Sequence, residues 1–392
     1  MTADLSGDFG EEEVMLLDLV DRFVDEQLIP LETDLLARVS DGEPLALLAE
    51  DERRLLDLCK EIGLWALDAP EEVGGAELRA GLMLEIHRRL ARTIVPFRFP
   101  PDSPNLHMLM LAGNDDQKKR YMEPYAQGEM TSNIAISEPQ AGADPAAMRT
   151  RAVKDGDEWV INGRKIWVSG AGTADFIILM AVTDPGKGAQ GMTAFIVETG
   201  TPGYIVERAI PMLGGVRTYE LVFDDMRISD AQVLGEVNEG YAPMQHRLTS
   251  RRLEMGSTCV ALAERALAMM CEHVQTREVF GETLASKQAI QWWIADAEIA
   301  IHATKLMVRD AAAKVERGED IRNNASMLKV YATEMATDII DKAMQSFGAM
   351  GMTQEFPLYV MANQIRLARI YEGPTEAHRM VVARRALKKY AS

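Results

Sequence analysis

Apolar residues recur at the spacing of amphipathic helices through the first third of the chain. These helical patterns stop at helix breakers such as Pro30 and Gly63, and a proline-rich loop interrupts them once. The patterned segments are 14–29, 52–62, 78–91 and 115–125, and the loop covers 96–104. We therefore predict a helical N-terminal domain over residues 1–128.

Near residue 130 the pattern changes to short apolar runs separated by turns. Asp155-Gly156-Asp157 and Asn162-Gly163 are typical turn sequences, and they flank a predicted strand at 158–161. Further strands are predicted at 165–169, 176–182, 192–198, 204–207 and 219–223. Strands at this spacing indicate a compact antiparallel β-domain, which we place at residues 129–236.

From about residue 240 the pattern is helical again, in longer segments. These segments are 243–277, 287–317, 322–347 and 375–390. Three long helices and a fourth are typical of an antiparallel bundle, which we assign to residues 237–392. The predicted fold class is α+β, with an N-terminal helical domain, a central antiparallel β-domain and a C-terminal four-helix bundle.

Composition narrows the possible partners. The 392 residues carry a formal net charge of −18, which argues against nucleic acid or an anionic membrane as a partner. The first residues lack the basic and apolar regions of a signal peptide, and no apolar run is long enough to span a bilayer. Three cysteines without metal-ligand spacing indicate reduced thiols. We expect a cytoplasmic protein without a metal site.

A turn close to the C-terminus carries an acidic residue between two predicted helices. Gly373-Pro374 cannot continue the helical pattern of 362–368, so Glu372 lies on the turn before the helix that begins at Thr375. Apolar neighbours can desolvate such a carboxylate and raise its pKa, which suits a general base. A solvated turn glutamate is the alternative, and this stretch alone favours it.

Two segments of the predicted β-domain have the residue types of a ligand site. One is an apolar strand that begins at Ile134 and continues into a loop of proline, glycine and alanine, where backbone amides can approach a ligand. The other places Trp167 and Ser169 on the same face of a strand. Paired across a sheet, the two segments could stack on a planar ring and bond to it. An ordinary strand-to-turn transition and a core tryptophan are the alternatives.

At this point the chain resembles the acyl-CoA dehydrogenase family over nearly its whole length. Five segments carry the resemblance and follow one another in the family's order. They are SEPQAGAD at 137–144, NGRKIWVS at 162–169, REVFG at 277–281, QSFGAMG at 345–351 and YEGPTE at 371–376.

The resemblance implies a non-covalent FAD between the β-domain and the C-terminal bundle. Trp167 would cover the isoalloxazine ring, and Ser169 would bond near N5. Arg277 and Gln288 of a neighbouring subunit would hold the diphosphate and adenosine part, so a dimer would complete each site. The implied FAD-binding residues are Ile134, Ile136, Ser137, Trp167, Ser169, Arg277, Phe280, Gln288, Gln345, Gly348, Ala349, Thr375 and Glu376.

The resemblance also implies that Glu372 is the catalytic base. Some family members carry the base on the first helix of the bundle, a location that aligns with Arg251; Glu254, one turn away, is the only nearby rival. The implied substrate-binding residues are Ala143, Leu248, Arg252, Tyr371 and Gly373. The chain departs from the family pattern at Gln140, Ala143, Pro374 and Glu376, which puts the acyl-CoA pocket in question.

The implied reaction is α,β-dehydrogenation of an acyl-CoA thioester to the 2-enoyl-CoA, as in fatty acid or acyl-CoA catabolism. Glu372 would remove the α-proton while the β-hydrogen leaves as hydride to the flavin. Implied partners are an electron-transfer flavoprotein and identical subunits, in a homodimer or homotetramer. Two alternatives stay open: a flavoenzyme of the same fold with other chemistry (oxidase, desulfinase or monooxygenase), and a non-catalytic subunit of a hetero-oligomer.

Overall fold

The computed structural model describes residues 9–101 and 104–391, which form two compact units. The helical unit contains the described residues up to Leu55, Leu78–Phe97 and the chain from Thr249 onward. The sheet unit contains Leu56–Glu77 and Arg98–Leu248. The segment that we predicted as one helical N-terminal domain thus contributes residues to both units.

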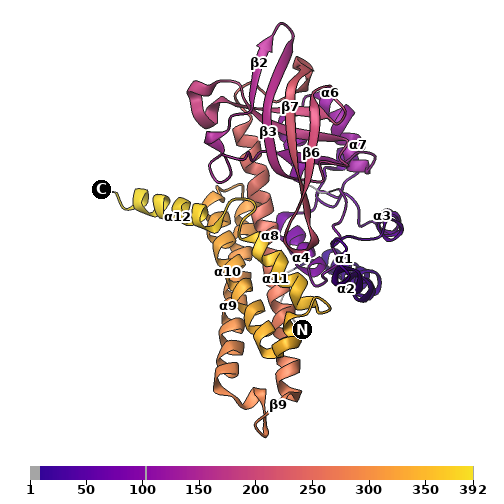
Figure 1. The fold of residues 1–392 in the computed structure, drawn as a ribbon, viewed down its shortest axis with the longest axis vertical. Helices are drawn as coiled ribbons and strands as arrows, with labels where there is room; N and C mark the ends of the chain where they lie inside the picture. Colours follow the sequence, from indigo (N-terminus) through magenta and orange to yellow (C-terminus); the bar gives the residue numbers. More distant parts are fainter. Residues whose placement is uncertain (1–8, 102–103, 392) are drawn as a thin grey trace. The chain divides into compact units, whose positions relative to one another are not determined.

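The helical unit is built around one long helix, α10 (Arg322–Phe347), whose bounds agree with the prediction. It packs against α9 (Gln288–Glu316), α11 (Pro357–Ala368) and α12 (Thr375–Lys389). The first long helix, α8 (Tyr241–Thr276), and a short hairpin of β9 (Glu278–Val279) and β10 (Glu282–Thr283) precede α9. Figure 1 shows α8 in salmon and α9 to α12 in orange to yellow.

Three N-terminal helices also belong wholly to the helical unit: α1 (Glu11–Phe23), α2 (Glu32–Ser40) and α4 (Ala80–Leu90). α1 packs on α4, and α4 packs on α9. Buried charges join them to α8, because Arg265 pairs with Glu32 at 2.6 Å and Arg88 bonds to Glu264 at 2.8 Å. A fourth helix, α3 (Ala49–Ile62), passes from one unit into the other.

The sheet unit contains one eight-stranded sheet, with strand order β6-β7-β3-β2-β4-β5-β8 and β1 beside β4. Most pairs are antiparallel as predicted, but β1 and β2 each pair with β4 in parallel. Short helices accompany the sheet: α5 (Pro104–Ala112), α6 (Asp115–Gln117) and α7 (Glu123–Gln127). The strands are β1 (Ser132–Ala135), β2 (Arg151–Asp155), β3 (Glu158–Ser169), β4 (Phe176–Val182), β5 (Met192–Glu198), β6 (Tyr204–Pro211), β7 (Arg217–Ser229) and β8 (Val233–Leu234).

The middle of this sheet is buried on both faces. All seven residues of β4 are buried; its even-numbered residues join one apolar cluster, and the odd-numbered ones from Ile177 to Ala181 join another. A continuous apolar run is what a strand covered on both sides requires. The prediction for this strand was therefore correct in both bounds.

The prediction of a turn at Asn162-Gly163 was wrong, because β3 continues through these two residues as one strand. Asn162 instead exchanges hydrogen bonds of 2.9 Å with Asp225 on β7, at a register shift between the two strands. Glycine is needed at 163 because a Cβ there would lie 2.4 Å from the Thr150 hydroxyl. The dipeptide marks a close approach of strands. The prediction also missed α5, which is apolar on all sides.

Candidate functional site

The two candidate segments of the sheet unit lie beside each other in the structure. The backbone amide of Ile166 donates to the carbonyl of Ser137 at 2.9 Å, and the Lys165 ammonium donates to the carbonyl of Ile136, also at 2.9 Å. Ile136 and Ser137 are half-buried there. The structure therefore brings together the residues that the sequence suggested as a pair.

Trp167 presents its indole at the end of β3. Its side chain is 50% exposed, and its φ of 63° is unusual for a bulky residue. The cause is a register shift between Lys165 and Val168, which changes the direction of the strand before it ends. Ser169 is exposed two residues later. A half-exposed indole held in strained backbone is an unusual surface feature and fits a planar ring stacked on it.

A buried ion pair that the sequence analysis missed supports these segments. Lys165 and Glu138 have side chains 0% and 1% exposed, and their charged atoms lie 2.8 Å apart. Glu138 also accepts bonds from the amides of Arg149 and Thr150 and from the Gln140 side chain. The sequence does contain a signal for this pair, because Glu138 and Lys165 are residues of opposite charge that each stand within or next to an apolar segment.

The pair is ionised at neutral pH. Burial raises the pKa of Glu138, but the charge and hydrogen bond of Lys165 outweigh this effect and leave the pKa lowered. Burial lowers the pKa of Lys165 to about 8, which still keeps the ammonium protonated at pH 7. The pair joins the loop at 136–140 to β3 and so fixes the position of Trp167 relative to Ser137.

The remaining predicted residues of the sheet unit fall into two groups. Leu248 is buried in an apolar cluster together with Met244, and Ile134 and Ile136 pack against the same cluster. Ala143 is exposed on the loop that follows Ser137. Leu248 therefore belongs to the apolar body beneath the first segment, whereas Ala143 lies on the surface.

The helical unit places Glu372 on the turn between α11 and α12, as the sequence predicted. The residue is half-buried, and its backbone is left-handed, with φ at 56°. Its carbonyl oxygen accepts one bond from Arg252 Nε at 3.0 Å and one from the His378 ring at 3.1 Å. The adjacent carbonyl, that of Gly373, accepts a bond from the Lys329 ammonium at 2.5 Å.

The other predicted residues of this turn surround Glu372. Tyr371 is half-exposed, Thr375 is buried, and Glu376 is exposed in the first turn of α12, where the helix dipole favours a carboxylate. Pro374 is the N-cap of α12 in extended backbone. Its rigid ring thus starts the helix directly after Gly373.

The rival carboxylate on α8 is already engaged. Glu254 Oε2 lies 2.6 Å from Arg251 Nη1, and both side chains are largely buried. A base on this residue would have to give up that ion pair when it takes a proton.

The other predicted FAD-binding residues lie at the far end of α8 and α10. Arg277 is exposed after α8, Phe280 is fully exposed at the tip of the β9–β10 hairpin, and Gln288 is exposed at the start of α9. The His273 ring on α8 stacks on Phe347 at the end of α10, with centroids 4.1 Å apart. The predicted residues of α10 and the turn after it, all exposed, are Gln345, Gly348 and Ala349.

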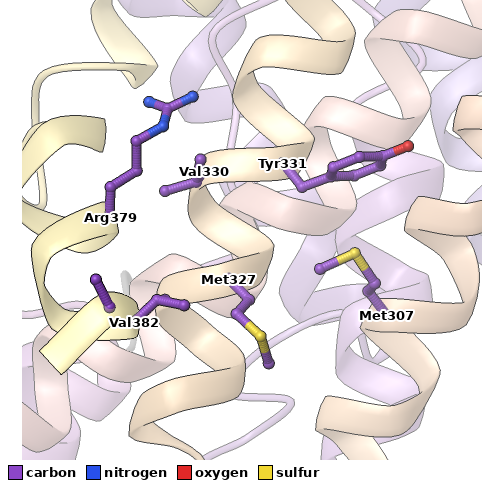
Figure 2. A pocket seen from close by; sticks show the side chains of 7 residues that line it. Met307, Met327, Val330, Tyr331, Arg379 and Val382 are labelled. Carbon is purple, nitrogen blue, oxygen red and sulfur yellow. The ribbon is translucent and has the colours of Figure 1, made fainter. Parts of the chain in front are cut away.

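An open apolar groove lies elsewhere on the helical unit. Figure 2 shows it between α9, α10 and α12, lined by Met307, Met327, Val330, Tyr331, Arg379, Val382 and Ala383. None of these is a predicted site residue. Apart from one arginine and one tyrosine the lining is apolar, so it offers little catalytic chemistry.

Within 9–101 and 104–391, no cluster of three or more His, Cys, Asp or Glu side chains could hold a metal ion. No helix in the same part of the chain is long and apolar enough to cross a membrane.

The chain is similar to known proteins over nearly its whole length. Models of the N-terminal, middle and C-terminal domains of acyl-CoA dehydrogenase match residues 10–129, 133–226 and 238–387. The chain is 36% identical to (R)-benzylsuccinyl-CoA dehydrogenase of Thauera aromatica, over 96% of both chains. It is 30% identical to the CarC subunit of the caffeyl-CoA reductase-Etf complex of Acetobacterium woodii, over 97% of this chain and all of that protein. Butyryl-CoA dehydrogenase of Megasphaera elsdenii has the same fold, with a TM-score of 0.86, 28% identity and coverage of 97% and 99% of the two chains.

Proposed function

Because the chain belongs to the acyl-CoA dehydrogenase family, we propose that it removes two hydrogens from a CoA thioester, with Glu372 as the base. The protein is an oxidoreductase that acts on CH–CH bonds. The observation that carries the proposal is the Glu372 turn. A half-buried carboxylate is held there in left-handed backbone, and its own carbonyl is bonded from two sides.

FAD is the cofactor, and when bound it supplies the acceptor for the β-hydrogen, which leaves as hydride. The residues that would hold its ring are Ile136, Ser137, Trp167 and Ser169. The exposed indole and the adjoining segments of the sheet unit support this assignment. Thr375 and Glu376, at the start of α12, are the corresponding residues in the helical unit.

Glu372 takes up the α-proton of the thioester on its carboxylate. Such a proton is too weakly acidic for a carboxylate in water, so the bound thioester carbonyl must receive hydrogen bonds as negative charge develops on it. Water must also be excluded, so that the carboxylate is basic enough for the transfer. Tyr371 and Gly373, next to the base, are the residues that we assign to contact the acyl group, with Arg252 on the CoA side.

We further propose an aryl-substituted acyl-CoA as the substrate. Benzylsuccinyl-CoA and caffeyl-CoA, named in two of the relatives, both carry an aromatic ring near the reacting carbons. The benzylsuccinyl-CoA relative, at 36% identity, carries this proposal, because butyryl-CoA dehydrogenase at 28% is hardly less similar than the caffeyl-CoA relative at 30%. An aryl chain such as 3-phenylpropanoyl-CoA is therefore the first compound to test.

An electron-transfer flavoprotein is the proposed electron acceptor, since one relative is a subunit of an Etf complex. We also propose that identical subunits complete each FAD site. On α8, Thr276 lies 24 residues after Arg252, or about 36 Å along the helix axis. One FAD cannot extend from the Glu372 turn to Arg277 of the same chain, so Arg277 and Gln288 would serve the FAD of a partner. Several exposed apolar side chains on α9, including Trp292 and Ile299, support such an association.

The test is Glu372→Gln, which keeps size and hydrogen bonding but removes the basic lone pair. With 3-phenylpropanoyl-CoA, we expect flavin bleaching in anaerobic stopped flow to slow by about 10²- to 10⁴-fold, while FAD content and acyl-CoA binding persist. Glu254→Gln is the matched control and should reduce flavin at close to the wild-type rate. The reverse pattern would place the base on α8 instead.

A further inference from the structure

The turn that carries Glu372 has an unfavourable backbone that other groups must hold in place. Glu372 and Gly373 have consecutive positive φ values, 56° and 93°. A left-handed conformation costs a residue with a side chain about 1–2 kcal/mol. Such a backbone persists only where its surroundings determine it. The bonds to the carbonyls of these two residues, from Arg252, Lys329 and His378, therefore help to fix the backbone from which the Glu372 side chain projects.

Lys329 provides one of these bonds from the interior of α10. Its side chain is fully buried, and its ammonium donates to the carbonyl of Gly373 at 2.5 Å. Within the described residues Lys329 forms no ion pair. Arg252, Cys259, Glu372 and Glu376 are the charged or titratable groups that act on it through space. A buried ammonium without a carboxylate partner is expensive, which indicates that the bond to the turn has a purpose.

His378 provides a second bond from the first turn of α12. Its Nε2 lies 3.1 Å from the carbonyl of Glu372, and its Nδ1 lies 3.1 Å from the Ser326 hydroxyl on α10. A carbonyl can only accept, so Nε2 carries the proton. The Ser326 hydroxyl has a single proton, which it shares between Nδ1 and the carbonyl of Arg322, 2.9 Å away. Gly373 makes room for this contact, because a Cβ at that position would lie 2.9 Å from Nε2.

We propose that Lys329 and His378 are positioning residues for the base. They hold two consecutive carbonyls of the turn, one from α10 and one from α12, and thereby aim the carboxylate of Glu372. Neither residue contacts the substrate in this role. The inference rests on the proposed function, in which Glu372 removes the α-proton.

Lys329→Met tests the first residue, because methionine keeps the length of the side chain but has no donor. We expect flavin reduction by 3-phenylpropanoyl-CoA to slow about 100-fold, with the Kd for the thioester changed by less than about threefold. Thr333→Val is the matched control, since Thr333 is also buried on α10. Among the described residues its hydroxyl bonds to the backbone carbonyls of Lys329 and Val330 on its own helix and not to the Glu372 turn. It should keep the wild-type rate. A wild-type rate in Lys329→Met, or an equal loss in Thr333→Val, would overturn the proposal.

A double variant separates positioning from a general effect on the fold. If Lys329 acts through the base, Lys329→Met should cause no further loss in the Glu372→Gln background. An equal further loss would mean that Lys329 acts independently of the base. If Glu372→Gln alone keeps the wild-type rate, the proposed function fails instead, whatever Lys329→Met does.

His378 is tested by a conservative pair. His378→Met removes the donor and should slow flavin reduction about tenfold. His378→Gln can place an amide N–H near the position of Nε2 and should restore most of the rate. Hydrogen exchange at Cα of a 3-thia-acyl-CoA in deuterium oxide gives a second readout, because this probe has no β-hydrogen and reports proton removal alone. Exchange at the wild-type rate in both Lys329→Met and His378→Met would contradict the proposed role.

Discussion

Two buried lysines, one in each unit, are held in different ways. Lys165 in the sheet unit and Lys329 in the helical unit are both fully buried, and burial lowers the pKa of each to about 8. Lys165 has a carboxylate partner, Glu138, at 2.8 Å. Lys329 bonds to a backbone carbonyl, and the nearby charge of Arg252 opposes its own.

We interpret the buried charge of Lys165 as structural, and that of Lys329 as one that is retained because it holds a functional turn. The Lys165–Glu138 pair compensates itself and joins two neighbouring segments of one sheet. Lys329 has no ion-pair partner within the described residues, and Glu372 and Glu376 favour its charge only through space, so its burial costs stability without an equal return from a partner in contact. Such a cost is expected where the fold gives up stability for function. Three predictions, beyond those for Glu372, Lys329 and His378 above, test this comparison.

The largest expected effect follows from breaking the compensated pair. Glu138→Ala leaves the Lys165 ammonium buried without its partner and should lower the free energy of unfolding by about 3–5 kcal/mol. Denaturant unfolding of the FAD-loaded protein, followed by circular dichroism, measures it. The double variant Glu138→Leu/Lys165→Met should recover most of this loss.

Glu220→Ala on the same sheet is the control for the broken pair. Glu220 itself is buried, but its partners Arg164 and Arg208 are more than half exposed, so water can solvate the arginines that lose it and the free energy of unfolding should fall by only about 1 kcal/mol. If Glu138→Ala cost no more than this control, the buried pair would not hold the two segments together.

A smaller effect should appear in the free energy of unfolding, which should depend on pH because of Lys329. Its pKa is about 8 in the folded state against 10.5 as the ordinary value. Between these values the unfolded state binds the proton that the folded state has released, so the free energy of unfolding rises with pH. The charged and titratable groups around it are Arg252, Cys259, Glu372, Glu376 and His378.

Lys329→Met should lack this rise. The free energy of unfolding of the wild type relative to the variant should therefore increase by about 2 kcal/mol between pH 7 and pH 9.5. Denaturant unfolding of both proteins across this range measures it. A constant difference would indicate that folding does not lower the pKa of Lys329.

The smallest effect concerns a departure from the family pattern. Gln140 stands where a glycine is common, and its amide donates to Glu138 Oε2. Because Gln140 is exposed, Gln140→Ala should lower the free energy of unfolding by only about 1 kcal/mol. In the Glu138→Ala background the same substitution should have almost no effect. A similar loss in both backgrounds would show that Gln140 stabilises the loop without Glu138.

Several features of the fold could be predicted because their signals are local. Both bounds of β4 and β5 and of α10 follow from continuous apolar runs or helical periodicity between clear breakers. The turn that carries Glu372 follows from Gly373-Pro374 in the same way. The prediction failed at Asn162-Gly163, where a turn sequence serves a close approach of strands, since only the partner strand reveals that need.

The sequence by itself determined the order of helical and sheet segments, the family and the residue that we propose as the base. These depend on periodicity and on motifs whose residues are neighbours in the chain. Only the tertiary structure decided that Lys165 pairs with Glu138, 27 residues earlier, and that Lys329 and His378 bond to the Glu372 turn from two helices. A buried charge takes its role from the group that folding brings within bonding distance, and no local pattern specifies that group.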